Sequence, residues 1–125
     1  MILKNREFHK WAKKAGLADL ALCRAVDEMK AGLVDADLGG GVFKKRVALP
    51  GRGKSGSVRT LLATNRDDRW FFVLGFEKNE RANITDRELI GLRIIADDLL
   101  SMTEKQMQAA FKDGSLVEVK DEKNK

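Results

Sequence analysis

The 125-residue sequence is poor in the residues on which disulfide, metal and histidine chemistry depend. It contains one cysteine, Cys23, one histidine, His9, one proline and no tyrosine. A single cysteine excludes an intramolecular disulfide and a cysteine-rich zinc site, and a single histidine disfavours histidine-based metal sites and Ser–His–Asp catalysis. The acidic residues are scattered, so we expect neither a metal nor another cofactor. This sparing use of cysteine is typical of a reducing compartment and predicts a cytoplasmic protein.

Long apolar runs are also missing. The longest, residues 70–74, is far too short to cross a membrane, and early charges interrupt the N-terminal stretch, unlike a secretory signal. With 43% hydrophobic and 34% charged residues, the composition predicts a soluble globular protein. The length predicts a single domain, which we place at residues 1–119, followed by a charged tail at residues 120–125.

Positive charge is concentrated in the middle of the chain. The formal net charge is +5, and residues 38–66 contain seven basic side chains and no acid. From residue 67 to the end, thirteen acids outnumber ten bases. Such a cluster favours a polyanion or an acidic protein as a partner. The alternative is a solvated basic surface that binds neither.

The first half of the chain predicts two helices followed by three strands. Apolar stripes at helical spacing predict helices over residues 3–15 and 17–31, joined at Gly16 as a helical hairpin. The strands are predicted over residues 42–49, 57–65 and 70–76. Their short connections predict an antiparallel meander.

Alternation along these strands predicts which side chains share a face. In the first strand, Phe43, Val47 and Leu49 fall on one face and Lys44 and Arg46 on the other, while Lys45 interrupts the apolar face in the manner of a position near a sheet edge. In the third strand, Phe72 and Phe76 are expected on one face and Phe71 on the other.

Two capping boxes predict helices in the second half. Thr85 to Glu88 opens a helix that runs to about Leu100, and Thr103 to Gln106 opens a shorter helix that ends at Gly114. Residues 115–119 are expected to add a last strand. The predicted fold class is therefore α+β: an N-terminal helical hairpin packed on a small antiparallel sheet, with C-terminal helices.

The segment PGRGKSG at residues 50–56 resembles part of a nucleotide-binding loop. Gly53-Lys54-Ser55 matches the end of that pattern, but Ala48 stands where a glycine is needed, and a strand follows instead of a helix. These two failures argue against an NTPase. Glycine still allows a phosphate to approach the backbone, where Arg52 and Lys54 would lie beside it.

The meander would allow basic side chains from separate segments to converge. These are Lys44, Arg46, Lys54, Arg59, Lys78 and Arg81. Such a cluster can cleave RNA without a metal, because the 2′-OH of the substrate attacks the adjacent phosphate while arginines stabilise the charge on the phosphoryl oxygens. A lysine whose pKa is lowered by neighbouring cations would transfer protons. DNA lacks the 2′-OH, so this chemistry selects RNA.

These segments resemble one protein family. The combination of KKR at residues 44–46, PGRGKSGSVR at residues 50–59 and FFVLGFEKNER at residues 71–81 resembles the RelE/ParE superfamily of toxins from bacterial type II toxin–antitoxin modules, and within it the HigB-like branch of RelE toxins. The resemblance implies a RelE-like toxin domain over residues 1–119. It also implies translation inhibition by mRNA cleavage, in RelE-like members on the ribosome, and a cognate antitoxin that neutralises the toxin.

The resemblance assigns roles to individual residues. Catalysis by proton transfer and charge stabilisation falls to Lys54, Lys78 and Arg81. Phosphate binding falls to Arg59, with Arg46 as a weaker match, and the basic cluster and glycine loop add Lys44 and Arg52 as further candidates for binding phosphate or RNA. Several RelE-type nucleases use a tyrosine or histidine near the end of the site, where this chain has Ala82 to Thr85. The general acid and base therefore stay open, as do two alternatives: a ParE-like toxin that binds gyrase without cutting RNA, and a basic nucleic-acid-binding module without toxicity.

Overall fold

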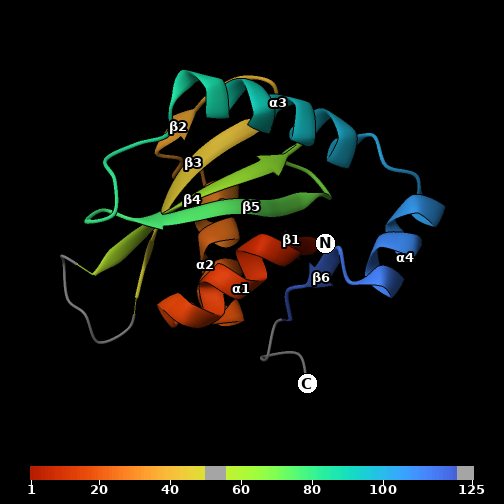
Figure 1. Cartoon of the computed structure of the whole chain (residues 1–125), viewed down its shortest axis with the longest axis horizontal. Helices are drawn as coiled ribbons and strands as arrows, with labels where there is room; N and C mark the ends of the chain where they lie inside the picture. The colour runs from red at the N-terminus through yellow and green to blue at the C-terminus, as the bar shows by residue number, and fades with distance from the viewer. Residues whose placement is uncertain (50–55, 121–125) are drawn as a thin grey trace.

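The computed structural model describes residues 1–49 and 56–120, in which helices cover both faces of one sheet (Figure 1). The six strands have the spatial order β2-β3-β4-β5-β1-β6. Their bounds are β1 Ile2–Asn5, β2 Ala36–Asp37, β3 Val42–Ala48, β4 Ser57–Thr64, β5 Trp70–Glu77 and β6 Leu116–Glu118. The helices are α1 Arg6–Ala15, α2 Asp19–Lys30, α3 Asp86–Leu100 and α4 Glu104–Asp113. The predicted α+β class and the meander β3-β4-β5 are confirmed.

Two apolar cores lie on opposite faces of the sheet. The helical hairpin α1–α2 covers one face, where Phe8, Leu22 and Met29 pack against Phe72 and Val47. The helices α3 and α4 contribute to the other core, where Leu92, Ala96 and Met107 pack with Leu61 and Phe71. Both capping boxes are present as predicted, and α4 ends at Gly114 with a left-handed backbone.

The start of the chain differs from the prediction. Residues 2–5 form the strand β1, which lies inside the sheet, parallel to β5 and antiparallel to β6. The helix begins only at Arg6, because the Asn5 side chain accepts a hydrogen bond from the backbone N–H of Phe8 and caps it. Leu3 is fully buried in the sheet. The predicted helix over residues 3–15 was therefore wrong in its first three residues.

A β-bulge overturns the expected arrangement of phenylalanines in β5. Leu61 pairs with Leu74 whereas Leu62 pairs with Phe72, so Val73 is an extra residue in the ladder. The extra residue shifts the alternation of side chains. Phe72 therefore packs in the α1–α2 core, and Phe76 packs with Phe71 in the core on the α3 side. The prediction that Phe72 and Phe76 share a face was wrong.

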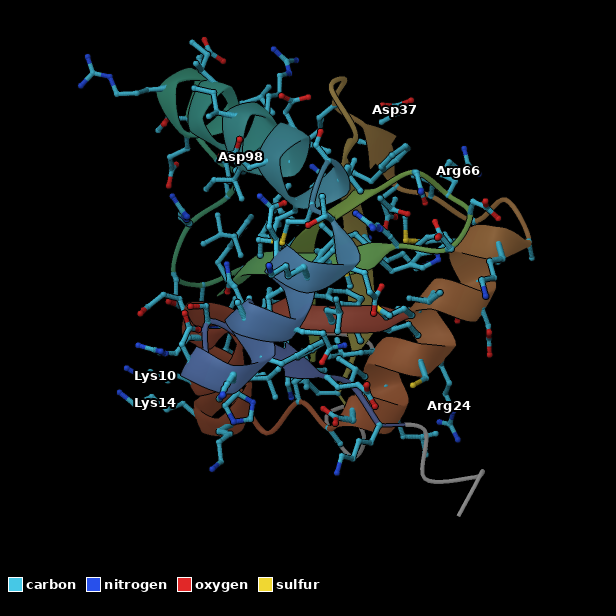
Figure 2. The ribbon with its side chains drawn as sticks, turned by 90° about the vertical axis from the view of Figure 1, so that its right-hand side faces the viewer. Lys10, Lys14, Arg24, Asp37, Arg66 and Asp98 are labelled. Atoms are coloured by element: carbon cyan, nitrogen blue, oxygen red, sulfur yellow. The ribbon has the colours of Figure 1, made fainter. Side chains whose placement is uncertain are left out.

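Charged side chains lie mostly at the surface, as Lys10 and Lys14 on α1 and Arg24 on α2 do in Figure 2. Lys45 is an exception, since its side chain is buried on the apolar face of β3. Its Nζ lies 2.7 Å from Oε1 of Glu28 on α2, which compensates the charge. Lys45 pairs with Thr60 of β4, whereas on the other side of β3 the strand β2 pairs only with Phe43 and Lys44. Lys45 therefore lies next to the edge of the sheet, as its position in the sequence pattern predicts.

Candidate nucleic-acid interface

The centre of the candidate site is a pair of arginines on neighbouring strands. Arg46 of β3 lies directly opposite Arg59 of β4 in the antiparallel ladder. Directly opposed residues project from the same face of a sheet, with Cβ atoms roughly 5 Å apart. This is the face that α3 covers farther along, around Leu61 and Ala63. The sheet therefore places the starting points of two arginine side chains side by side on one face.

The carboxylate of Asp35 accepts the backbone N–H of Arg46 at 2.5 Å, but the ion pairs within residues 1–49 and 56–120 include neither guanidinium group of the two arginines. Arg59 donates from Nη1 to the backbone carbonyl of Ser57 at 3.4 Å. Like charges directly opposite each other destabilise a sheet. An anion between the two side chains would remove that cost, which makes the pair a phosphate-binding candidate.

A third arginine continues the row across β5. Arg59 pairs with Phe76, whose ring is buried on the same face. The guanidinium of Arg81 lies 5.0 Å from the centre of that ring. Arg81 follows the turn that β5 enters at its end, where the backbone N–H groups of Glu80 and Arg81 both donate to the carbonyl of Glu77. A row of side chains therefore crosses the three adjacent strands β3, β4 and β5. It consists of Arg46, Arg59 and Phe76, with the guanidinium of Arg81 lying over the Phe76 ring.

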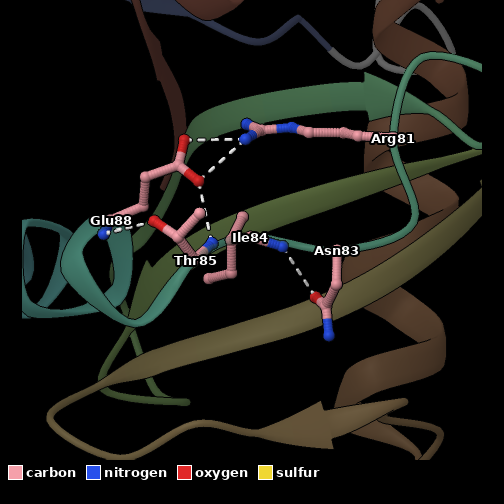
Figure 3. Close-up of polar contacts among 5 residues, drawn as sticks. All are labelled: Arg81, Asn83, Ile84, Thr85 and Glu88. Atoms are coloured by element: carbon pink, nitrogen blue, oxygen red, sulfur yellow. Dashed lines mark hydrogen bonds and ion pairs between the residues drawn. The ribbon is translucent and has the colours of Figure 1, made fainter.

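Glu88 holds Arg81 in this position (Figure 3). Nη1 of Arg81 donates to both carboxylate oxygens of Glu88, at 2.7 and 2.8 Å. The same carboxylate accepts the backbone N–H of Thr85 in the capping box of α3. The hydrogen bond from Arg81, followed by that from Thr85, lowers the pKa of Glu88. Glu88 is therefore ionised at neutral pH and ties the turn after β5 to the first turn of α3.

The remaining predicted site residues fall into three groups. Lys44 lies one pair farther along β3 on the same face as Arg46, half-buried and opposite Leu61. Lys78 is exposed in the turn between β5 and Arg81. Arg52 and Lys54 lie outside the described residues, as does the tail after Lys120. The structure therefore brings Arg46, Arg59 and Arg81 into one row and leaves the predicted convergence of all six cations untested.

Arg46 also borders a pocket of about 360 Å³ between α2 and β3. Arg24 and Glu28 line it from the helix, and Val47, Ala48 and Ser57 line it from the sheet. Glu28 is paired with Lys45, so the two arginines dominate the charge of the pocket. The basic surface therefore continues from the face of the sheet around its β3 edge toward α2.

Sequence reasoning missed Phe76 and Glu88 as parts of this site. Phe76 was interpreted as a packing residue on the wrong face, because the bulge leaves no signal in the alternation. Glu88 was recognised only as the end of a capping box. The capping box already accounts for a glutamate at this position, so nothing in the sequence indicates a second role for it. Its contact with Arg81 spans seven residues and a loop, and loops show no periodicity from which such a contact could be predicted.

The described residues do not bring three or more histidine, cysteine, aspartate or glutamate side chains together as a metal cage would. No helix in the described part of the chain is long and apolar enough to cross a membrane. A family model for the RelE toxin of the RelE/RelB toxin–antitoxin system matches residues 1–119. Comparison with curated proteins gave no match.

Proposed function

This chain belongs to the RelE toxin family and is a toxin of a toxin–antitoxin system, and from this premise we propose that it inhibits translation by cutting mRNA, on the ribosome, without a metal. Family membership implies a partner antitoxin. The finer assignment to the HigB-like branch is part of the same proposal and rests on the GRGKSG and FEKNER segments. The observation that carries the proposal is the Arg46–Arg59 pair, which forms no ion pair with a described residue and lies in line with Arg81.

The proposed reaction is an internal transesterification. The 2′-oxygen of a ribose attacks the adjacent phosphorus, the bond from phosphorus to the 5′-oxygen breaks, and a cyclic phosphate remains. Arg46 and Arg59 bind the non-bridging oxygens of the phosphate. Arg81 stabilises the additional negative charge of the transition state, which an always-protonated guanidinium does without proton transfer.

Proton transfer is the task proposed for Lys54 and Lys78. One base must accept the proton of the 2′-OH, and one acid must protonate the departing 5′-oxygen. In the sequence, Lys54 lies between Arg46 and Arg59, and Lys78 lies between Arg59 and Arg81. In this proposal one lysine acts in its neutral form as the base and the other in its protonated form as the acid.

The experiment is a map of new mRNA 5′ ends minutes after the chain is induced alone in bacteria. Wild type is expected to produce new ends inside coding regions, in step with codons. Arg59→Ala should lower their yield by about 100-fold, the effect of losing one charge-stabilising donor. Lys14→Ala is the matched control, because it removes one exposed positive charge from α1. It should leave cleavage unchanged.

Other outcomes would reject the proposal in distinct ways. Growth arrest without new ends would favour the alternative of a ParE-like toxin that binds gyrase, and a supercoiling assay with purified gyrase would then test that alternative directly. Harmless expression would favour a nucleic-acid-binding module. Normal cleavage by the double variant Lys78→Ala/Arg81→Ala would overturn the site assignment while leaving the nuclease function standing.

A further inference from the structure

The helix α3 exposes an apolar face that residues 1–49 and 56–120 leave uncovered. Ile90, Ile94 and Ile95 are 59%, 61% and 43% exposed. The opposite side of α3 already packs on the sheet through Leu92, Ala96 and Leu99, so these isoleucines are not needed for the core (Figure 1). Isoleucine gains free energy by burial, and three exposed on one helix indicate a surface that another protein covers.

Gly91 lies within this face and has no task in the isolated chain. A Cβ added to it would meet no atom within 4 Å. Glycine inside a helix costs about 1 kcal/mol relative to alanine. A glycine beside exposed isoleucines allows the backbone of a second helix to approach closely, and the side chain of an opposing residue to fit into the gap.

The charges at the two ends of the face are of opposite sign. Arg87 stands at the N-terminal end and Asp98 at the C-terminal end; both are exposed, and neither forms an ion pair with a described residue. Asp98 is labelled in Figure 2. Arg87 and Asp98 are equally far in sequence from the midpoint of the face, which lies between Leu92 and Arg93. Ile90 and Ile95 are also equally far from this midpoint.

This arrangement is self-complementary. When two α3 helices pack antiparallel about a two-fold axis at that midpoint, each Arg87 meets Asp98 of the other copy. Ile94 meets Gly91, while Ile90 and Ile95, which lie about 140° apart around the helix, flank this contact on its two sides. A closed two-fold interface requires such reciprocal matching of one surface with itself.

We propose that the outer face of α3, formed by Arg87, Ile90, Gly91, Ile94, Ile95 and Asp98, binds a second copy of this chain as an antiparallel helix pair. The 15-residue helix is about 22 Å long. Its contact area is at the small end for specific interfaces, below roughly 1,200 Å². The dimer is therefore weak and forms in a concentration-dependent way. The proposal does not depend on the nuclease activity.

The decisive experiment mixes two charge variants of the full-length chain in analytical ultracentrifugation. Arg87→Asp places two aspartates opposite each other across the interface, and Asp98→Arg does the same with arginines. Each variant alone is expected to be monomeric. A mixture of the two should form heterodimers, because every pair across the interface then joins opposite charges. The double variant Arg87→Asp/Asp98→Arg should dimerise as wild type does.

Two further variants separate association from folding. Gly91→Ala should raise the melting temperature, since helix propensity improves and the space is open. It should weaken the dimer by about tenfold, which corresponds to the loss of close contact at the crossing. Ile94→Arg should abolish dimerisation, whereas Leu33→Arg, at a residue 60% exposed outside α3, should leave it intact.

Three results would overturn the proposal. One is a wild-type chain that stays monomeric up to millimolar concentration. Another is a dimer that Ile94→Arg does not disturb. The third is a charge-variant mixture that fails to associate while each variant remains folded by circular dichroism. If Ile94→Arg instead removed binding of the antitoxin from a monomeric chain, the face would belong to that partner.

Discussion

Arg46 and Arg59 face each other directly across the β3–β4 ladder, and no described carboxylate forms an ion pair with either of them. Nothing in the hydrogen bonding of the sheet requires this pairing. It costs folding free energy because the charges repel. An anionic ligand bound between the two arginines would offset this repulsion. Binding of the anion would therefore stabilise the folded protein.

The first prediction concerns this linkage. A short DNA oligonucleotide, which lacks the 2′-OH and cannot be cut, should raise the melting temperature of the wild-type chain by binding the folded state. Arg46→Ala/Arg59→Ala should show a much smaller rise. Without oligonucleotide, the double variant should be at least as stable as wild type, because the repulsion is gone. Differential scanning fluorimetry at constant ionic strength measures both effects. An equal oligonucleotide-induced rise in the double variant would contradict the assignment.

The second prediction concerns Glu88 and acid. Its pKa is lowered in the folded chain by Arg81 and Thr85, so its contribution to stability is fully present above the unfolded-state pKa. The contribution is lost as the pH falls through the folded-state pKa. Glu88→Gln should therefore flatten the stability curve in the acid range below the unfolded-state pKa of about 4.5. Urea unfolding across that range measures the slope, and an unchanged slope would show that the pair contributes nothing.

The third prediction concerns Gly75 of β5, which lies directly against Trp11 of α1. A Cβ at this position would come within 2.1 Å of the indole ring, at Cζ3. Gly75→Ala should therefore reduce the free energy of unfolding by about 1–3 kcal/mol, the usual cost of overpacking. Gly91→Ala is the internal control, because the same substitution there meets open space. Equal effects at both positions would contradict the close approach of Trp11.

The fourth prediction concerns the buried ammonium of Lys4. Its Nζ lies 2.7 Å from Oδ1 of Asp19, whose other oxygen accepts the backbone N–H of Lys120. Asp19→Ala leaves the Lys4 charge buried without its partner and should cost roughly 3 kcal/mol, the lower end for a broken buried pair, because the Asp19 side chain is 26% exposed.

The double variant Lys4→Met/Asp19→Ala should recover much of that loss, since no buried charge remains. Equilibrium denaturation of both variants gives the comparison. If the double variant were less stable than Asp19→Ala alone, the contact would be a net source of stability beyond charge compensation.

The parts of the fold that could be predicted from sequence are those with local signals. The capping boxes at Thr85 and Thr103 place the starts of α3 and α4, because a side chain and a backbone N–H three residues apart define them. β1 has no comparable signal. Its four residues become a strand only through partners in β5 and β6 far along the chain, and four residues are too few to show a period.

The candidate site was predictable in composition but not in register. Sequence places Arg46, Arg59 and Arg81 on consecutive segments, yet pairing by one residue more or less would have sent Arg46 and Arg59 to different faces. The bulge at Val73 decides which face Phe76 takes, and with it what lies beneath Arg81. The register and the bulge depend on packing between segments far apart in the chain. The local sequence pattern does not reveal this packing.

The position of β1 has a consequence for the order in which the sheet can form. Ile2–Asn5 precedes the other five strands in the sequence, but its neighbours in the sheet are β5 and β6, the two strands that come last. β1 can therefore enter the sheet only after both of those strands have been synthesised. Because pairings between segments far apart in the sequence form slowly, closure of the sheet around β1 is expected to be a late step of folding.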